Sequence, residues 1–140
     1  MIKFTKERSV SIDDILHLYQ AVGWTNYTNQ PQMLEQALSH SLTTYLARDG
    51  EEIVGLVRLV GDGFSSVFVQ DLIVLPSYQR QGIGSNLMKE ALADYKDAYQ
   101  IQLATEQTEK NLGFYRSLGF ETLSTYDCTG MIWVDRKNLQ

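Results

Sequence analysis

Cysteine, proline and long apolar runs are scarce in this sequence of 140 residues. It contains one cysteine, Cys128, and two prolines, Pro31 and Pro76. A single cysteine excludes a disulfide within the chain and a cysteine-cluster metal site, and it is compatible with a reducing compartment. No apolar stretch approaches the roughly 20 residues that cross a bilayer, and the first residues lack the apolar segment of a signal peptide. We therefore expect a cytoplasmic protein with no membrane partner and no metal.

Basic residues are also few. Lys and Arg number 12 against 17 Asp and Glu, which gives a formal net charge of -5. Strong, sequence-independent binding to nucleic acid needs a basic surface, so we expect no nucleic-acid partner. An acidic protein can attract cationic small molecules such as amines, whereas any anion must be held by local donors. The length is that of one domain, and no repeat or linker divides it, so we predict a single domain over residues 1–140.

Hydrophobic periodicity predicts alternating helices and strands. The predicted strands cover residues 2–5, 42–48, 52–60, 66–75, 101–104, 120–125 and 131–134. The predicted helices run from the cap Ser11 to Gly23, and over residues 31–39, 82–98 and 111–118, with a loop at 24–29. The three central strands form an antiparallel meander that turns at Asp49-Gly50. The helix after them connects two parallel strands by a right-handed crossover. The order β-α-α-β-β-β-α-β-α-β-β predicts an α/β (α+β) fold, with a mixed, mostly antiparallel sheet flanked by helices.

The turn into the longest predicted helix carries the strongest chemical signal. Gly82 and Gly84 lack Cβ, so the backbone there can bend tightly and approach a ligand. The first N–H groups of a helix have no intrahelical partner, and together with the helix dipole they form an anion site. Arg80 adds a positive charge. A pyrophosphate fits this turn, although two glycines near a helix start are a weak signal alone and more often mark a plain strand-to-helix turn.

Other phosphate-binding motifs fit less well. The sequence has no Gly-x-x-x-x-Gly-Lys-Ser/Thr run for a nucleoside triphosphate. The dinucleotide fingerprint Gly-x-Gly-x-x-Gly fails because Gly82-Ile83-Gly84 continues to Leu87, and no suitable acid follows a second parallel strand.

Two motifs resemble the GCN5-related N-acetyltransferase (GNAT) superfamily. The family's cofactor motif, Gln/Arg-x-x-Gly-x-Gly/Ala, matches Gln79, Gly82 and Gly84 after a hydrophobic strand and Pro76. A second signature, Asn followed by Phe-Tyr and Leu-Gly-Phe, matches the run 111–120. The resemblance is specific between Gln70 and Phe120, and the order of strands and helices agrees with the GNAT fold along nearly the whole chain.

The resemblance implies a site for acetyl-CoA as co-substrate. Backbone N–H groups would hold the pyrophosphate, and a strand edge would pair with pantetheine as an added strand does. An N–H near Ile73 would point at the thioester carbonyl and stabilise the developing oxyanion. Asn111 would contact the pantetheine arm. The implied cofactor residues are Leu72, Ile73, Val74, Gln79, Arg80, Gln81, Gly82, Ile83, Gly84, Ser85 and Asn111.

Tyr115 is the candidate general acid. A thiol has a pKa of about 8.5, so a tyrosine hydroxyl near the sulfur can donate a hydrogen bond or proton as the tetrahedral intermediate collapses. Phe114 and Tyr115 are adjacent and point to different faces of the helix, so one can pack while the other faces a cleft. The alternative is that Tyr115 only packs.

The acceptor side is less clearly marked. Asp71 is offered as general base or water-positioning group, with a purely positioning role as the alternative. Gln70 points to the other face of the same strand and could orient a substrate. Trp24, Tyr27 and Tyr45 are candidates for the acceptor pocket, or pack the loop.

These features predict an acetyl-CoA-dependent N-acetyltransferase that transfers acetyl directly to a primary amine. Three alternatives stay open: an acyl-CoA sensor without turnover, an unrelated nucleotide-binding regulator, and an enzyme with another acyl chain or a hydroxyl acceptor. Many members of the family dimerise, so a homodimer is a further expectation.

Overall fold

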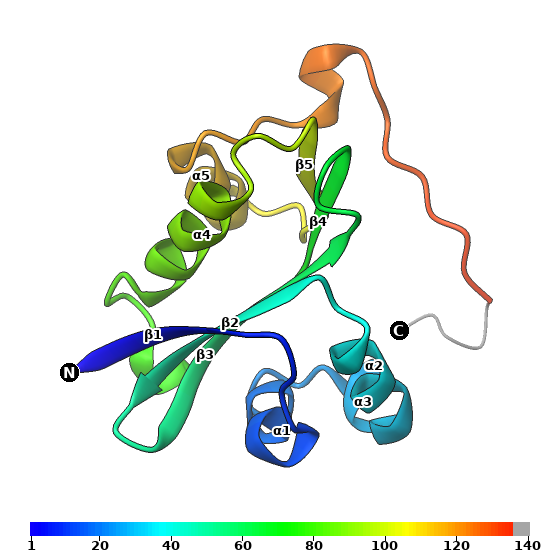
Figure 1. Ribbon diagram of the computed structural model, residues 1–140. Coiled ribbons are helices and arrows are strands. Elements are labelled where there is room, and N and C mark those ends of the chain that lie inside the picture. The colour runs from blue at the N-terminus through cyan, green and yellow to red at the C-terminus, as the bar shows by residue number, and fades with distance from the viewer. Residues whose placement is uncertain (136–140) are drawn as a thin grey trace. The chain divides into compact units, whose positions relative to one another are not determined.

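The computed structural model describes residues 1–135 and divides into two compact units (Figure 1). The N-terminal unit covers Met1–Ala104 and the C-terminal unit begins at Thr105. The elements of the N-terminal unit are β1 (Ile2–Glu7), α1 (Ile12–Ala21), α2 (Thr25–Thr28), α3 (Pro31–Ser39), β2 (Thr43–Asp49), β3 (Glu52–Gly61), β4 (Ser66–Val74), η1 (Pro76–Tyr78), α4 (Ile83–Asp94) and β5 (Gln100–Leu103). The C-terminal unit contains α5 (Glu109–Ser117) and the 3₁₀ turn η2 (Leu123–Tyr126). The single domain expected over residues 1–140 stays a prediction.

The N-terminal unit is built on one five-stranded sheet. Its order is β1-β2-β3-β4-β5, antiparallel throughout except for the parallel pair β4–β5. This confirms the predicted mixed, mostly antiparallel sheet, including its central meander. Helix α4 connects the two parallel strands, as predicted.

Helices cover both faces of the sheet, α1 to α3 on one and α4 on the other (Figure 1). Beneath α1 and α3, Leu46, Leu56 and Ile73 join Ile15 and Leu18 in one buried cluster. The sheet's strands are almost continuously apolar because side chains of both faces are buried. Within residues 1–135, every helix is too short or too polar to span a bilayer.

Strand β4 contains one extra residue, Gln70. Arg58 of β3 pairs with Asp71, and the next residue of β3, Leu59, pairs with Val69, so Gln70 has no opposite residue. Such a β-bulge changes the face to which the following residues point. Gly55 faces α4, because a Cβ there would meet Ile83 and Leu87; alternation along β3 and pairing across it place Val69 on that same face.

After the bulge, β4 faces the other helices. Asp71 contacts Tyr19 of α1, and Ile73 belongs to the cluster beneath α1 and α3. The bulge therefore aims Asp71 at α1 and α2 instead of α4.

Two parts of the predicted secondary structure are wrong. Residues 24–29, predicted as a loop, contain the short helix α2, which is closed by backbone hydrogen bonds from Thr28 to Trp24 and from Asn29 to Thr25. Residues 120–125 and 131–134, predicted as strands, form η2 and a stretch without helix or strand. Asp127 ends η2 with φ 59°, and the N–H of Cys128 donates to Leu123 O, so the chain turns where alternation predicted an extended strand. A strand also needs a neighbour to pair with.

Candidate active site

The turn between β4 and α4 has unusual backbone conformations at two positions. After η1, Arg80 takes φ 66° and Gly82 takes φ 79°. Positive φ is uncommon for a residue with a side chain and costs about 1 kcal/mol or more, so Arg80 is held there by its surroundings. The Nε2 of Gln79 donates to Val74 O at 3.1 Å and ties this turn back to the end of β4.

Among residues 1–135, no capping side chain accepts from the N–H groups in the first turn of α4. Ile83, Gly84 and Ser85 lie in that turn, where backbone donors have no intrahelical acceptor. Gly82 carries no capping side chain, and no acidic residue lies in the first turn. Helices α1 and α5 begin with a Ser or Thr cap and at least one acidic residue, whereas α3, like α4, has neither and begins with a proline. The start of α4 can therefore receive an anion, with Arg80 exposed beside it.

Among residues 1–135, the edge of β4 next to this turn pairs with no other strand. Its pairing with β5 covers only Ser66–Val69, whereas its pairing with β3 continues to Val74. The N–H of Leu75 donates to Val54 O. Because hydrogen-bonded positions alternate in an antiparallel pair, Ile73 also faces β3, and the peptide groups of Leu72 and Val74 face the free edge. The N–H group expected to donate to the thioester near Ile73 is therefore that of Leu72 or Val74. The side chain of Ile73 itself packs in the core.

Asp71 lies in a buried network on the α1 side of the sheet. Its carboxylate accepts from Arg58 Nε at 2.7 Å, Tyr19 OH at 2.8 Å and Tyr27 OH at 2.9 Å. Asp71 and Arg58 are each 3% exposed. Three donors surround the carboxylate and its side chain is only 2% exposed, so an acceptor amine has no open approach to it. This geometry favours the positioning role for Asp71 over general base.

The network extends to the predicted acceptor residues. Tyr27 OH also accepts from Arg58 Nη2 at 3.1 Å and from Gln70 Nε2 at 3.4 Å. Burial, followed by the charge of Asp71, raises the pKa of Tyr27, so its hydroxyl stays protonated. The ring of Trp24 packs against Tyr19 and Tyr27 at centroid distances of 6.0 and 6.3 Å. Trp24, Tyr27 and Gln70 are therefore brought together.

Tyr45 is not part of this group. Its hydroxyl donates to Asp94 of α4 at 2.6 Å, on the opposite face of the sheet. The expectation that Tyr45 lines a pocket with Trp24 is wrong, because residues of β2 alternate between the two helix layers.

Sequence reasoning missed Arg58 and the polar role of Tyr19. Burial acts to lower the pKa of Arg58, but the carboxylate of Asp71 outweighs it, so the pKa lies above its usual value and the guanidinium is charged. A signal was present: Arg58 is a lone charge inside the apolar run Leu56-Val57-Arg58-Leu59-Val60. Charged residues are almost never fully buried without a partner, so this pattern predicts a buried ion pair.

Tyr115 and Asn111 both lie on α5 in the C-terminal unit. The ring of Tyr115 makes edge contacts with Phe114 and Phe120 at centroid distances of 5.0 and 6.0 Å. Its hydroxyl has no hydrogen-bond partner among residues 1–135, and burial raises its pKa. Asn111 Nδ2 donates to Thr105 Oγ1 at 3.1 Å, and the Asn111 N–H donates to the capping Thr108. Tyr115 thus offers a protonated, uncommitted donor, and Asn111 supports the loop before α5.

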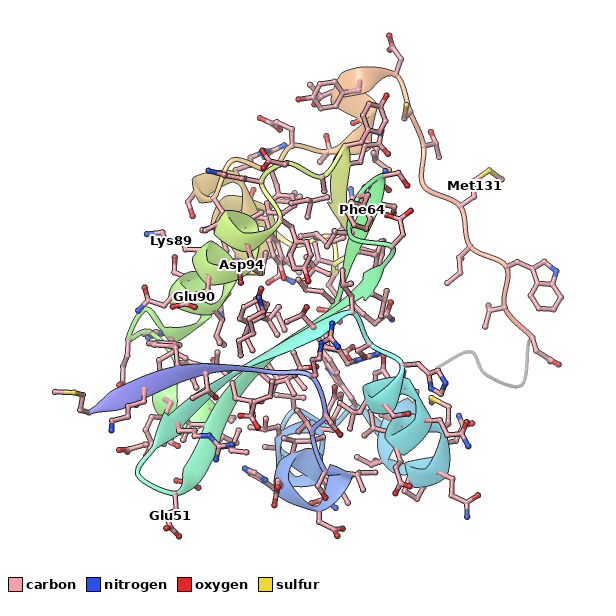
Figure 2. All side chains as sticks on the ribbon, in the orientation of Figure 1. Glu51, Phe64, Lys89, Glu90, Asp94 and Met131 are labelled. Atoms are coloured by element: carbon pink, nitrogen blue, oxygen red, sulfur yellow. The ribbon has the colours of Figure 1, made fainter. Side chains whose placement is uncertain are left out.

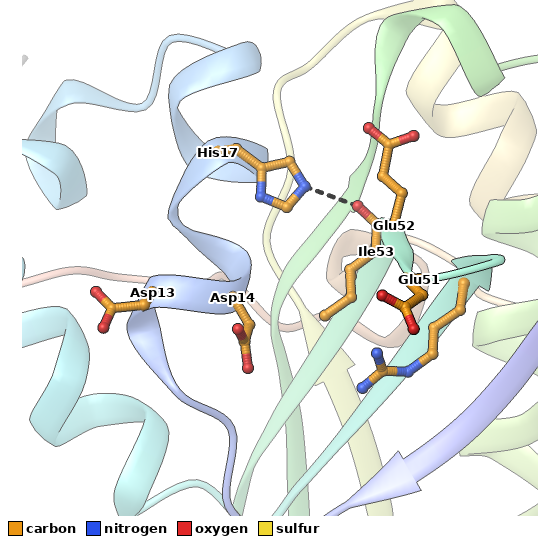
Figure 3. A pocket seen from close by; sticks show the side chains of 7 residues that line it. Asp13, Asp14, His17, Glu51, Glu52 and Ile53 are labelled. Carbon is orange, nitrogen blue, oxygen red and sulfur yellow. Dashed lines mark hydrogen bonds between the residues drawn. The ribbon is translucent and has the colours of Figure 1, made fainter.

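A separate hollow of about 400 Å³ lies between the start of α1 and the β2–β3 hairpin (Figure 3). In it, His17 Nε2 donates to Ile53 O at 2.7 Å. The lining residues are Asp13, Asp14, His17, Arg48, Glu51, Glu52 and Ile53. Arg48 is paired with Glu7 at 2.9 Å, so the carboxylates give the hollow a negative character.

Comparison with known proteins identifies the family. Residues 40–122 match the family model described as acetyltransferase (GNAT) domain. A GNAT family acetyltransferase from Streptococcus pneumoniae TIGR4 has 74% identity, a TM-score of 0.89, and coverage of 97% of this chain and 99% of that chain. The chain therefore belongs to the GNAT acetyltransferase family, as the two motifs indicated.

Two further relatives are more distant. Serotonin N-acetyltransferase 2, chloroplastic, from Oryza sativa subsp. japonica is 33% identical over 65% of this chain, and the match spans about half of that protein (48%). A GNAT family acetyltransferase from Elizabethkingia anophelis, solved with acetyl-CoA bound, shares the fold with a TM-score of 0.63 at 21% identity, covering 86% of this chain and 76% of that chain.

Proposed function

We propose that this chain transfers the acetyl group of acetyl-CoA directly to a primary amine. The observation that carries the proposal is the uncapped start of α4 beside the free edge of β4. The start of α4 offers N–H donors for a pyrophosphate. The edge of β4 offers peptide groups for the amide-containing pantetheine. The acetyl-CoA bound to the Elizabethkingia anophelis relative supports this ligand.

Each part of the turn has a proposed role in holding the cofactor. The N–H groups of residues 80–85 bind the pyrophosphate, and Arg80 adds charge. Leu72 and Val74 pair with pantetheine through their outward peptide groups, and one of these N–H groups donates to the thioester oxygen. Gln79 fixes the turn against Val74, and Asn111 shapes the loop before α5.

The proposed reaction proceeds without a covalent enzyme intermediate. The neutral amine attacks the thioester carbon, and the oxygen gains negative charge that a backbone N–H stabilises. The C–S bond then breaks, and the CoA sulfur takes a proton from the hydroxyl of Tyr115. The nitrogen loses its extra proton to water, and Tyr115 is reprotonated from solvent. The products are the acetylated amine and CoA thiol.

The acceptor amine must lose a proton before it attacks, and we propose that Asp71 does not accept this proton directly. Keeping a lysine-like amine neutral near pH 7.4 costs about 4 kcal/mol. Since the carboxylate of Asp71 already accepts from three donors, we assign it to positioning Tyr27 and Arg58, and water carries the proton. Trp24, Tyr27 and Gln70 then form one wall for the acceptor, in which an aromatic face suits an alkylammonium group.

A primary amine is favoured as acceptor by two observations. The net charge of -5 attracts cations. The rice relative bears the name of an enzyme that acetylates serotonin, which is itself a primary amine.

The second candidate is an acyl-CoA sensor without turnover. The occupied carboxylate of Asp71 favours it, because Asp71 then offers no ready general base to an acceptor amine.

One experiment separates these candidates. Acetyl-CoA is incubated with the protein and a panel of polyamines, arylalkylamines, amino acids and lysine peptides, and the release of CoA thiol is read. We expect release that depends on one class of amine, with the acetylated product seen by mass spectrometry. Calorimetry measures CoA binding in parallel. Binding without acceptor-dependent thiol would identify a sensor, and competition by ATP would identify a nucleotide-binding regulator.

A further inference from the structure

The turn that is proposed to hold the pyrophosphate has a strained backbone. Arg80 carries a side chain and still takes φ 66°, two residues before Gly82 with φ 79°. Positive φ is disfavoured for a residue with a Cβ, so an unsupported chain would rarely hold the turn in this form. Contacts from outside the turn are therefore needed to keep the N–H groups of residues 80–85 pointing to one place.

Two side chains just before Arg80 tie the turn to the sheet. Gln79 Nε2 donates to Val74 O at 3.1 Å, which closes the turn on its own strand. Tyr78, the last residue of η1, reaches a different part of the sheet, where its hydroxyl donates to Asp49 Oδ2 at 2.6 Å. Hydrogen bonds from a neutral hydroxyl to a carboxylate are shorter and stronger than those between neutral groups. The bond to Asp49 also raises the pKa of Tyr78, so the hydroxyl remains a donor at neutral pH.

Asp49 is a well-fixed anchor for this bond. It is the last residue of β2, where it pairs with Ile2 of β1 on one side and with Glu52 of β3 on the other. The hairpin turn that follows uses Gly50, with φ 62°, and does not need the carboxylate of Asp49. Aspartate is also among the residues that strands disfavour. The hairpin itself therefore gives no reason for a carboxylate at this position, whereas the hydroxyl of Tyr78 does.

We propose that Asp49 is a positioning residue for CoA, which acts through Tyr78 to hold the pyrophosphate turn in its binding form before CoA binds. The inference rests on the cofactor site of the proposed function. A turn that spends only a fraction of its time in the binding form weakens the observed affinity by that fraction, whereas a turn that is already ordered does not. The β2–β3 hairpin thereby takes part in cofactor binding without any contact between Asp49 and the cofactor.

A direct contact between Tyr78 and CoA predicts a different result. In that case the side chain of Tyr78 would matter for affinity and the carboxylate of Asp49 would not. Where the hydrogen bond is the important feature, removing either partner has the same effect, and removing both adds nothing further. A double-mutant cycle therefore separates positioning from direct contact.

The test measures CoA binding to the full chain by calorimetry. We expect Tyr78→Phe and Asp49→Ala each to raise the dissociation constant about 5- to 10-fold, and the double variant to raise it no further than either single variant. Asp49→Asn keeps an oxygen that accepts from Tyr78 and should recover most of the affinity. Tyr78→Phe leaves in place the 3.9 Å contact between Asp49 Oδ1 and the Met1 amino group, so the loss cannot come from that contact.

Two control variants remove the same chemical groups from other places in the N-terminal unit. Glu51→Gln neutralises an exposed carboxylate in the same hairpin, and Figure 2 shows this side chain projecting from the end of the hairpin. Tyr45→Phe breaks a Tyr–Asp bond of the same length, 2.6 Å, to Asp94 at the far end of α4, which Figure 2 labels. Both variants should bind CoA as the wild type does. Circular dichroism checks that every variant is folded.

The outcomes distinguish this inference from the proposed function. A wild-type chain that binds no CoA would overturn both. A wild type that binds CoA, with either Tyr78→Phe or Asp49→Ala binding it equally tightly, would overturn the positioning role alone. A double variant in which the two losses multiply would show that Tyr78 and Asp49 act separately, and would also overturn it.

Discussion

Two regions of the N-terminal unit differ in whether their polar groups have hydrogen-bond partners within the chain. Around Asp71, every polar group of the cluster has a partner in the chain itself, from α1, α2 and β3. A few residues further along, the edge of β4 at Leu72 pairs with no strand among residues 1–135, Val74 O is met only by the side chain of Gln79, and the first turn of α4 has no side-chain cap. The same strand therefore leads from a closed region to an open one within four residues.

This difference separates stability from binding. Buried polar groups without partners are costly, so a fold satisfies those it encloses. Backbone N–H groups at a surface can lack a partner in the protein, because they donate to water until a ligand binds. We therefore expect changes in the closed region to reduce the free energy of unfolding, and changes in the open region to reduce affinity or turnover while leaving stability nearly unchanged.

The largest expected effect is on Asp71. Asp71→Asn removes the negative charge beside the buried guanidinium of Arg58 and should lower the free energy of unfolding by about 3–5 kcal/mol. Urea denaturation measures the change. Asp97→Asn removes the same charge from an exposed site and should shift stability by no more than about 0.5 kcal/mol. Similar small shifts in both variants would mean that the cluster is not the closed region described above.

Tyr115 tests whether an open hydroxyl does chemistry. Tyr115→Phe should lower kcat by about 100-fold, because it removes the proton donor to the thiolate, and the dissociation constant for CoA should hardly change. Burial raises the pKa of Tyr115, which favours the protonated form. The rate of the wild type should therefore fall through deprotonation of Tyr115 only at a pH above about 10, the ordinary pKa of tyrosine. Steady-state kinetics across pH gives both results, and equal kcat in mutant and wild type would remove Tyr115 from the mechanism.

Gly82 tests the open start of α4. Gly82→Asp places a carboxylate beside the proposed pyrophosphate site and should weaken CoA binding by about 2 kcal/mol, or roughly 30-fold. Gly82→Asn is the matched control, since Asn and Asp both tolerate positive φ and differ mainly in charge. A Cβ at this position meets no atom within 4 Å, so steric crowding by the protein is small. Calorimetry that finds the same affinity for both variants would place the pyrophosphate elsewhere.

The smallest effect is expected at the start of α1, which is closed. Ser11 Oγ accepts from the Asp13 N–H at 3.3 Å. Ser11→Ala should therefore lower stability by about 1 kcal/mol and leave CoA affinity unchanged. Ser9→Ala, two residues earlier and outside the helix, should change neither. Thermal unfolding and calorimetry on the two variants complete the contrast with Gly82.

Local signals were sufficient to predict most of the fold. Ser11, Pro31 and the Asp49-Gly50 turn each act on neighbouring residues, so the elements they bound were predicted within a few residues. The turn into α4 was predicted for the same reason, because Gly82 and the helix it precedes are consecutive in the chain.

Features that depend on distant residues were not predicted. The ion pair of Arg58 and Asp71 forms because two strands lie in one particular register, and that register contains a bulge that no single residue announces. The apolar residues 131–134 predicted a strand, but local composition does not supply a neighbour to pair with. The partners of Asp71 were not predicted for the same reason, since its three donors come from positions 19, 27 and 58.

The extra residue at Gln70 divides β4 into two halves whose side chains alternate in opposite order. Before it, odd-numbered side chains face α4; after it, odd-numbered side chains face α1. The side chain of Gln70 is exposed, but its peptide unit cannot be omitted, because deleting it would turn Asp71 and Ile73 toward α4 and Leu72 and Val74 toward α1. The number of residues in this segment therefore decides which side chains reach the network around Arg58.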